Sequence, residues 1–323
     1  MIVPQYWAEA RVQYKGRRRQ ITVRRFGWSD TSQEEAQANA ERRAREALEE
    51  LRDGEQLQRR EPRVPYDGAD GVPIREEVLE RHGEVVVTRN AYGARCLNSP
   101  DVLFVDIDFE RQAPPCFAFA LFATAAAAAL LAGWLWQSAA LLAALMLVAL
   151  LASGLLVNRL YRLFIAWHGG FEGLARRRIE RFLRRNPDWN LRVYRTPAGL
   201  RVLVTQRTFR PDEPAVADCF AALGADPRYA RMCRRQQCFR ARLSAKPWRI
   251  GVAGRPRPGL WPVAPQWQHL RGRWIDRYER IAGDFAACRF VASLGSGRID
   301  PQVARVQHLH DALSGAESQR PLA

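Results

Sequence analysis

The feature that most constrains this chain is an uncharged apolar stretch near its middle. Between Arg111 and Arg159 the sequence contains no Lys, Arg, Asp, Glu or His, and the apolar stretch itself runs for 41 residues, from Phe117 to Val157. At the usual helical rise, one helix of this length would span roughly 60 Å, whereas the hydrocarbon core of a bilayer is about 30 Å thick. The stretch therefore predicts two membrane-crossing helices.

A polar interruption divides the stretch in two. The residues from Gly133 to Ser138 read GWLWQS, which places two tryptophans and two polar residues where a tight turn would meet the far headgroups. We therefore expect helices at about 116–136 and 139–160, inside a transmembrane segment that covers 113–160. A buried helix pair in a soluble core is the alternative, but a stretch this long without a charge favours the membrane.

Basic residues after the stretch predict its orientation. Arg159 and Arg162 follow the second helix closely, and a cluster of arginines comes next along the chain. Such clusters favour the cytoplasmic side of a membrane. The N-terminus lacks the apolar core of a signal peptide, so we expect both soluble segments, and both termini, to be cytoplasmic. The clustered arginines, candidates for contact with anions or lipid, are Arg176, Arg177, Arg178, Arg181, Arg184 and Arg185.

Charge is distributed unevenly on the two sides of the stretch. Residues 1–112 carry 19 Lys and Arg against 21 Asp and Glu, a net charge of −2, whereas residues 159–323 carry 31 against 13, a net charge of +18. The excess positive charge could meet anionic lipid headgroups, nucleic acid or an acidic protein.

The two soluble segments, 1–112 and 161–314, mix strand and helix patterns, which predicts an α+β fold with an antiparallel or mixed sheet. The first includes a hairpin at 6–26, an alanine-rich helix, a short helix at 73–81 and three strands. The second includes a helix at 171–185, a hairpin at 191–205 and a later helix that carries Cys288 and ends at Gly295. We expect the strand before the insertion to join the hairpin after it in one composite domain, and residues 315–323 to be disordered.

The helix at 171–185 has two interpretations. Phe171, Ile179 and Phe182 line one side of it, and arginines fill most of the remainder. The helix could lie on the inner leaflet, with its apolar side in the membrane and its arginines at the headgroups. It could equally cover the soluble sheet and expose a solvated arginine face.

The sharpest local pattern is the run DVLFVDIDFE from Asp101 to Glu110. In a strand, alternation places Asp106, Asp108 and Glu110 on one face. Carboxylates at this spacing repel one another unless they are solvated or bridged by a cation, and their oxygens suit Mg²⁺ or Mn²⁺, which hold phosphate oxygens during phosphoryl transfer. A solvated strand end beside the membrane is the alternative.

The same strand, together with the helix at 171–185 and the hairpin YRTPAGLRVLVT, resembles the core of archaeo-eukaryotic-type primase-polymerases. That family pairs a D-x-D strand with a later hairpin that carries a histidine. The matching position here holds Leu200 and Arg201, so the histidine is missing. The resemblance implies metal ligation by Asp106 and Asp108 alone, and in such a site Arg195 and Arg201 would be candidate phosphate contacts.

Phrases in both soluble segments resemble a family of uncharacterised bacterial transmembrane proteins with two membrane helices. The matching phrases are PQYWAEARVQ, VRRFGWSD, YDGADGVPIREE, TRNAYGARCLNSPDVLFVDIDF and CFRARLSAKPWRIG. The resemblance implies a location in the bacterial inner membrane and transfers no activity.

Two further patterns carry less information. The six cysteines form no Cys-x-x-Cys pair and match no zinc spacing, which favours buried thiols over a disulfide framework or a metal site. Tryptophans and cationic residues interleave from Lys246 to Trp274, a composition that suits lipid contact or ordinary surface packing and, less well, stacking on single-stranded nucleic acid.

These patterns favour an inner-membrane protein of undetermined activity, whose basic cytoplasmic domain contacts anionic lipid or a protein partner. One alternative is a phosphoryl-transfer or nucleotide-binding domain that depends on Mg²⁺ or Mn²⁺. The other is a membrane-tethered nucleic-acid binder.

Overall fold

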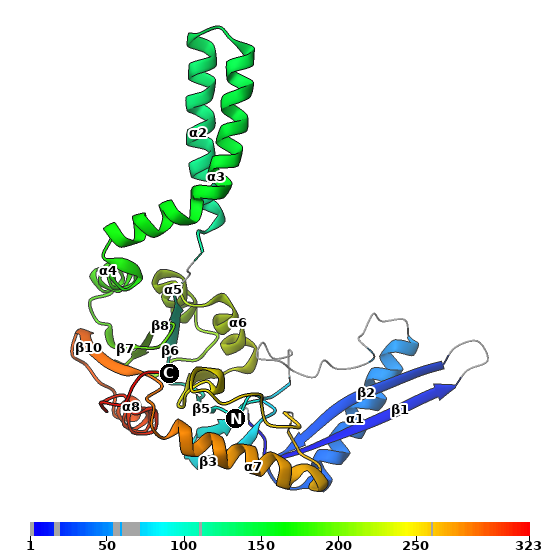
Figure 1. Cartoon of the computed structure of the whole chain (residues 1–323). Coiled ribbons are helices and arrows are strands. Elements are labelled where there is room, and N and C mark those ends of the chain that lie inside the picture. Colours follow the sequence, from blue (N-terminus) through cyan, green and yellow to red (C-terminus); the bar gives the residue numbers. More distant parts are fainter. Residues whose placement is uncertain (1–2, 16–19, 54–58, 60–71, 110–111, 260) are drawn as a thin grey trace.

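Two antiparallel sheets, each built from strands on both sides of the apolar insertion, form the centre of the protein (Figure 1). A computed structural model describes residues 3–15, 20–53, 59, 72–109, 112–259 and 261–323. The described residues have an α+β fold, as the sequence predicted.

The first sheet has the strand order β10-β7-β8-β6, and β6, which precedes the insertion, lies beside β8, which follows it. The predicted pairing across the insertion is therefore present. Helices α4 (Gly170–Arg185) and α8 (Pro301–Ser314) cover opposite faces, since Ile179 of α4 lies near Leu200, whereas the ring of His310 in α8 contacts that of Tyr194. The strands are β6 (Phe104–Asp108), β7 (Asn190–Arg195), β8 (Gly199–Val204) and β10 (Arg289–Gly295).

The second sheet has the order β3-β4-β5-β9, in which only β9 comes from the part of the chain after the insertion. Helix α7 (Pro265–Ala282) lies against this sheet, where Glu279 accepts hydrogen bonds from Arg89 and Arg95. One apolar core joins the two sheets and includes Leu97 of β5 and Val105 of β6. The remaining elements here are β3 (Glu77–His82), β4 (Val85–Arg89), β5 (Arg95–Ser99), β9 (Phe239–Arg242), α5 (Pro214–Leu223) and α6 (Pro227–Gln236).

A separate two-stranded sheet lies beside the main body (Figure 1) and consists of β1 (Tyr6–Lys15) and β2 (Gln20–Ser29). Helix α1 (Gln33–Arg52) packs on it through fully buried alanines, among them Ala36 and Ala40. A Cβ at Gly27 would collide with the backbone of both alanines, so small residues on each side permit the close approach.

The apolar stretch forms two helices, α2 (Pro115–Leu135) and α3 (Ala139–Trp167), which extend side by side away from the sheets (Figure 1). Among the described residues, α2 is long and apolar enough to cross a membrane. Helix α3 qualifies as well if its halves, Ala139–Ala152 and Gly154–Trp167, count as one span that is bent by 57°.

Two predictions about local structure were wrong. The segment 73–81 is not a helix, because its last five residues belong to β3, which returns through Gly83 (φ 61°) to pair with β4. Pairing with a buried strand here outweighs the helix propensity of a Glu- and Arg-rich segment. The helix expected to continue through Cys288 to Gly295 ends at Ala282, and the later residues form β10, which is paired with β7.

The chain end is ordered, which corrects the expectation of disorder at 315–323. Ala316 and Ala323 are buried. The Ala286 amide donates to the Pro321 carbonyl at 2.9 Å, and the Ala323 amide donates to the Ala286 carbonyl at 3.2 Å. These residues pack beside Ala286, just before β10, and no local sequence pattern predicts this contact.

Candidate functional site

Asp106 is bound to an arginine inside the fold. The antiparallel register places it directly across from Arg201 of β8. Arg201 Nε donates to Oδ1 at 2.8 Å and Nη2 donates to Oδ2 at 3.4 Å, from a side chain that is almost fully buried. Burial alone would lower the pKa of Arg201, but Asp106 raises it above its usual value. Both oxygens of Asp106 therefore already accept hydrogen bonds from a buried cation.

The Arg201 guanidinium continues into a buried polar chain. Its Nη1 donates to the Arg242 carbonyl at 2.8 Å and lies 3.3 Å from His310 Nε2. His310 Nδ1 lies 2.9 Å from Asp311 Oδ1, and Nε2 lies 3.8 Å from Cys288 Sγ. Burial opposes charge on both partners, yet their mutual attraction raises the pKa of His310 and lowers that of Cys288. Although Cys, His and Asp occur here in the order that activates a nucleophile, Cys288 and His310 are wholly buried and inaccessible to a substrate.

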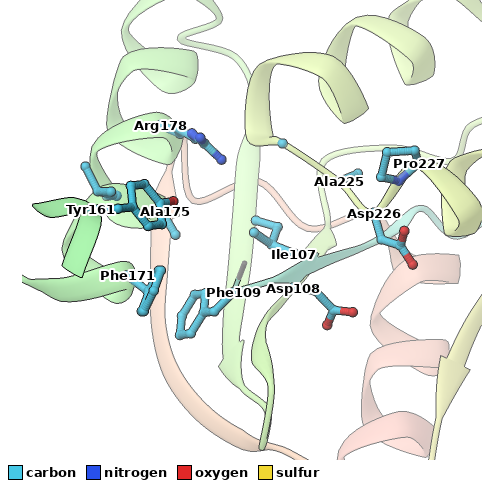
Figure 2. A pocket seen from close by; sticks show the side chains of 12 residues that line it. Ile107, Asp108, Phe109, Tyr161, Phe171, Ala175, Arg178, Ala225, Asp226 and Pro227 are labelled. Atoms are coloured by element: carbon cyan, nitrogen blue, oxygen red, sulfur yellow. The ribbon is translucent and has the colours of Figure 1, made fainter. Parts of the chain in front are cut away.

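Asp108, at the end of β6, borders a pocket between α3, α4 and the start of α6 (Figure 2). Arg178 lies at one end of the cavity, which measures about 250 Å³, and Asp108 and Asp226 lie at the other. Within the described chain, Asp108 has no hydrogen bond or ion pair from its side chain. Burial raises the pKa of Asp108, and the charges of Asp106 and Asp226 raise it further. The aromatic wall consists of Phe109, Tyr161 and Phe171.

The predicted metal ligands do not form a complete site in the described part of the chain. There, no group of three or more His, Cys, Asp or Glu side chains is arranged to hold a metal ion. Alternation does place Asp106 and Asp108 on one strand face, but Asp106 is engaged by Arg201, and Glu110 lies outside the described residues. Asp108 alone retains its full capacity as an oxygen ligand.

The cysteines of the C-terminal segment are dispersed in the core. Cys219, Cys233, Cys238 and Cys288 are all buried and free of disulfides. Burial raises the pKa of Cys219 and of Cys238 to about 12. Both thiols are therefore protonated and unreactive at neutral pH, as expected for core residues.

A basic group that the sequence did not connect with Asp108 lies near it. Lys246 follows β9, and burial lowers its pKa, as do the positive charges of Arg242 and Arg249. Asp108 acts on Lys246 in the opposite direction. One carboxylate with a raised pKa beside one amine with a lowered pKa is an arrangement found at functional sites.

An aromatic side chain stands next to this basic group. Lys246 Nζ lies 5.5 Å from the centre of the Trp248 ring, which is 60% exposed, and this ring meets Tyr92 edge-on at 5.3 Å. The sequence flagged Trp248 as part of an Arg- and Trp-rich segment. The sequence alone could not place this Arg- and Trp-rich segment beside β6, because the segment and the strand are far apart in the chain and no motif links them.

All six predicted anion-contacting arginines lie on α4 and are exposed. The apolar side of the helix is buried against the first sheet through Ala175, Ile179 and Phe182. Of the two interpretations, the one in which the helix covers the sheet is therefore correct, since its apolar side is not available to a bilayer. The six arginines remain accessible.

The two candidate phosphate contacts on the hairpin do not converge. Arg195 pairs with Glu172 at 2.8 Å and lies over the ring of Phe109, whereas Arg201 is held by Asp106 on the opposite face of the strand pair. The two guanidinium groups therefore cannot bind one anion together.

No family model, curated protein or solved structure matches the chain.

Proposed function

We propose that this chain is an integral protein of the bacterial inner membrane, in which α2 and α3 both cross the bilayer and both termini are cytoplasmic. The α+β domain is thereby tethered by its middle. Its basic side, led by the arginines of α4, contacts the anionic inner leaflet. An acidic protein at the membrane surface is a further partner compatible with the same charge.

The division of α4 into two sides carries the proposal. Its apolar side is buried in the core of the domain. Its six exposed arginines follow directly after α3, the second helix of the apolar hairpin. A basic side chain near an anionic leaflet contributes about 1 kcal/mol. Several arginines held on one rigid helix would thus orient the domain without requiring any part of α4 to enter the hydrocarbon.

Shielding of α4 in a bilayer of controlled charge tests the proposal. The full chain carrying Cys116→Ala and Arg181→Cys would be labelled with a fluorophore and reconstituted in nanodiscs of neutral lipid or of neutral lipid with phosphatidylglycerol. We expect anionic lipid to shield the label from iodide at low salt and high salt to remove the shielding. A label at Arg305→Cys on α8, across the sheet from α4, serves as the control and should respond to neither. Equal quenching of the Arg181→Cys label in both lipids contradicts the leaflet contact.

A second candidate function is binding of a phosphate-bearing small molecule, such as a nucleotide, at the Lys246 group. The opposed pKa shifts of Asp108 and Lys246 favour it, and so does the exposed ring of Trp248, on which a base could stack. If Asp108 took part through a divalent ion, binding would depend on Mg²⁺ or Mn²⁺.

Calorimetric titration of the full chain with ATP, with and without Mg²⁺, tests this candidate. We expect Lys246→Ala to abolish binding and Arg255→Ala, an exposed neighbour in the following loop, to preserve it. Absence of heat with the unmodified chain, or equal binding by both variants, rejects the site.

A further inference from the structure

The second half of α3, Gly154–Trp167, has one face held by the protein. On this face the Tyr161 ring packs against Phe117 of α2 at 5.3 Å, and Ile165 is 3% exposed. The Asn158 side chain accepts a hydrogen bond from the Ala113 amide at 3.1 Å. The segment is thus anchored at the start of α2.

The opposite face of the same segment is apolar and exposed. Leu156, Leu160, Leu163 and Trp167 recur at intervals of four, three and four residues, which aligns them in one stripe along the helix. Leu163 is 66% exposed and Trp167 is 88% exposed. Arg159 and Arg162 are exposed too and lie outside this stripe. An apolar stripe with a tryptophan and flanking arginines is the composition of helices that lie in a membrane interface.

The bend of α3 places this stripe at a defined level. The segment turns 57° away from the first half of the helix. The ring of Phe117, near the first residue of α2, contacts both Tyr161 and Phe164 of the segment. The segment therefore crosses the base of the hairpin where the apolar stretch begins, which is the level of the inner headgroups if α2 spans the bilayer.

We propose that Gly154–Trp167 completes, at an oblique angle, the crossing that Ala139–Ala152, at about 21 Å, is too short to make alone. The segment does so as an interfacial helix, with its Leu and Trp stripe in the acyl boundary of the inner leaflet and Arg159 and Arg162 at the headgroups. The inference rests on the proposed membrane crossing. The exposed stripe contacts lipid, because it is continuous with the apolar hairpin and the neighbouring arginines complement an anionic surface. The segment fixes the angle at which the rigid α4 and its sheet meet the membrane, which a straight spanning helix would not do.

Nitroxide depth measurements on the full chain in phosphatidylcholine–phosphatidylglycerol nanodiscs test the inference. Labels would be placed singly on the Cys116→Ala background at Leu163→Cys in the stripe, Arg162→Cys at its border, Ala127→Cys near the middle of α2 and Arg305→Cys on α8. Collision with oxygen and with a water-soluble nickel chelate gives the depth of each label.

We expect the Leu163→Cys label about 5–10 Å below the headgroups, the depth of interfacial helices. The Arg162→Cys label should lie closer to water, and the Ala127→Cys label should be the deepest. If the Ala127→Cys label is deep but Leu163→Cys is as accessible to nickel as Arg305→Cys, the interfacial helix is wrong and the membrane crossing stands. If Leu163→Cys and Arg162→Cys are equally deep, the Leu and Trp stripe is not directed into the leaflet and the inference also fails. A water-exposed Ala127→Cys label overturns both proposals.

Discussion

Asp106 and Arg201 form an ion pair that connects the part of the chain before the apolar insertion with the part after it. Their Oδ1 and Nε atoms are 2.8 Å apart, across the antiparallel register of β6 and β8. The pair explains how two segments separated by an apolar helical hairpin adopt one register. It also gives Asp106 a stabilising role that the D-x-D pattern did not suggest.

Replacing Asp106 should destabilise the fold. In Asp106→Asn the buried Arg201 loses its counter-charge, and breaking one side of a buried pair costs about 3–5 kcal/mol. Urea unfolding in detergent micelles should show the loss at neutral pH. Asp218→Asn, at an exposed position of α5, serves as control and should unfold like the unmodified chain. A stability of Asp106→Asn equal to that of the control would show that the pair contributes nothing.

Replacing Asp108 should have the opposite effect, and the effect should depend on pH. Burial raises the pKa of Asp108, so its charge disfavours the folded state once the pH exceeds the folded-state pKa, and this penalty disappears below the unfolded-state pKa. Asp108→Asn should therefore raise the thermal midpoint at pH 7, with a gain that shrinks as the pH falls towards about 4. A gain that is constant with pH, or a loss at pH 7, would argue against this description of Asp108.

Enlarging a buried alanine should detach α1 from its hairpin. Ala40 is fully buried against Gly27, and inserting a larger side chain into such a contact typically costs about 1–3 kcal/mol. We expect Ala40→Leu to lose amide protection along α1 in hydrogen-exchange experiments. The matched variant is Ala38→Leu, at an exposed position of the same helix, which should keep its protection. Equal exchange in the two variants would mean that the close approach is unimportant.

Thiol reactivity should separate one cysteine from the other five. Cys116 is exposed and the remaining cysteines are buried, including Cys288, whose lowered pKa would otherwise favour reaction. N-ethylmaleimide should add once to the native chain, not at all to Cys116→Ala, and six times to the denatured chain, as counted by intact-mass spectrometry. Addition to native Cys116→Ala would reveal an opening of the core around Cys288 or its companions.

The elements that sequence patterns predicted are those in which local signals are strong. The uncharged stretch and the alanine-rich segment of α1 both correspond to observed helices. The segment at 73–81 was misread because its strand depends on pairing with β4, a contact that lies outside any local window. For the same reason β10 was missed, because it pairs with β7, which lies almost a hundred positions earlier in the sequence.

The candidate site was predicted only in part, for a similar reason. Alternation correctly placed Asp106 and Asp108 on one face. It could not reveal that Asp106 forms an ion pair with Arg201, or that Lys246 lies near Asp108. The ambiguity of the α4 helix was also physical, because the same amphipathic pattern serves a bilayer surface and a protein sheet. Only the packing of Ile179 and Phe182 decides between them.

Cysteine accessibility in spheroplasts tests the central claim, the double crossing of the membrane, most directly. On the Cys116→Ala background, Trp136→Cys at the turn of the hairpin should react with a membrane-impermeant maleimide in intact spheroplasts. Gln37→Cys on α1 and Arg305→Cys on α8 should react only after lysis. Labelling of Gln37→Cys or Arg305→Cys before lysis, or protection of Trp136→Cys until lysis, would contradict a hairpin that crosses twice with both termini in the cytoplasm.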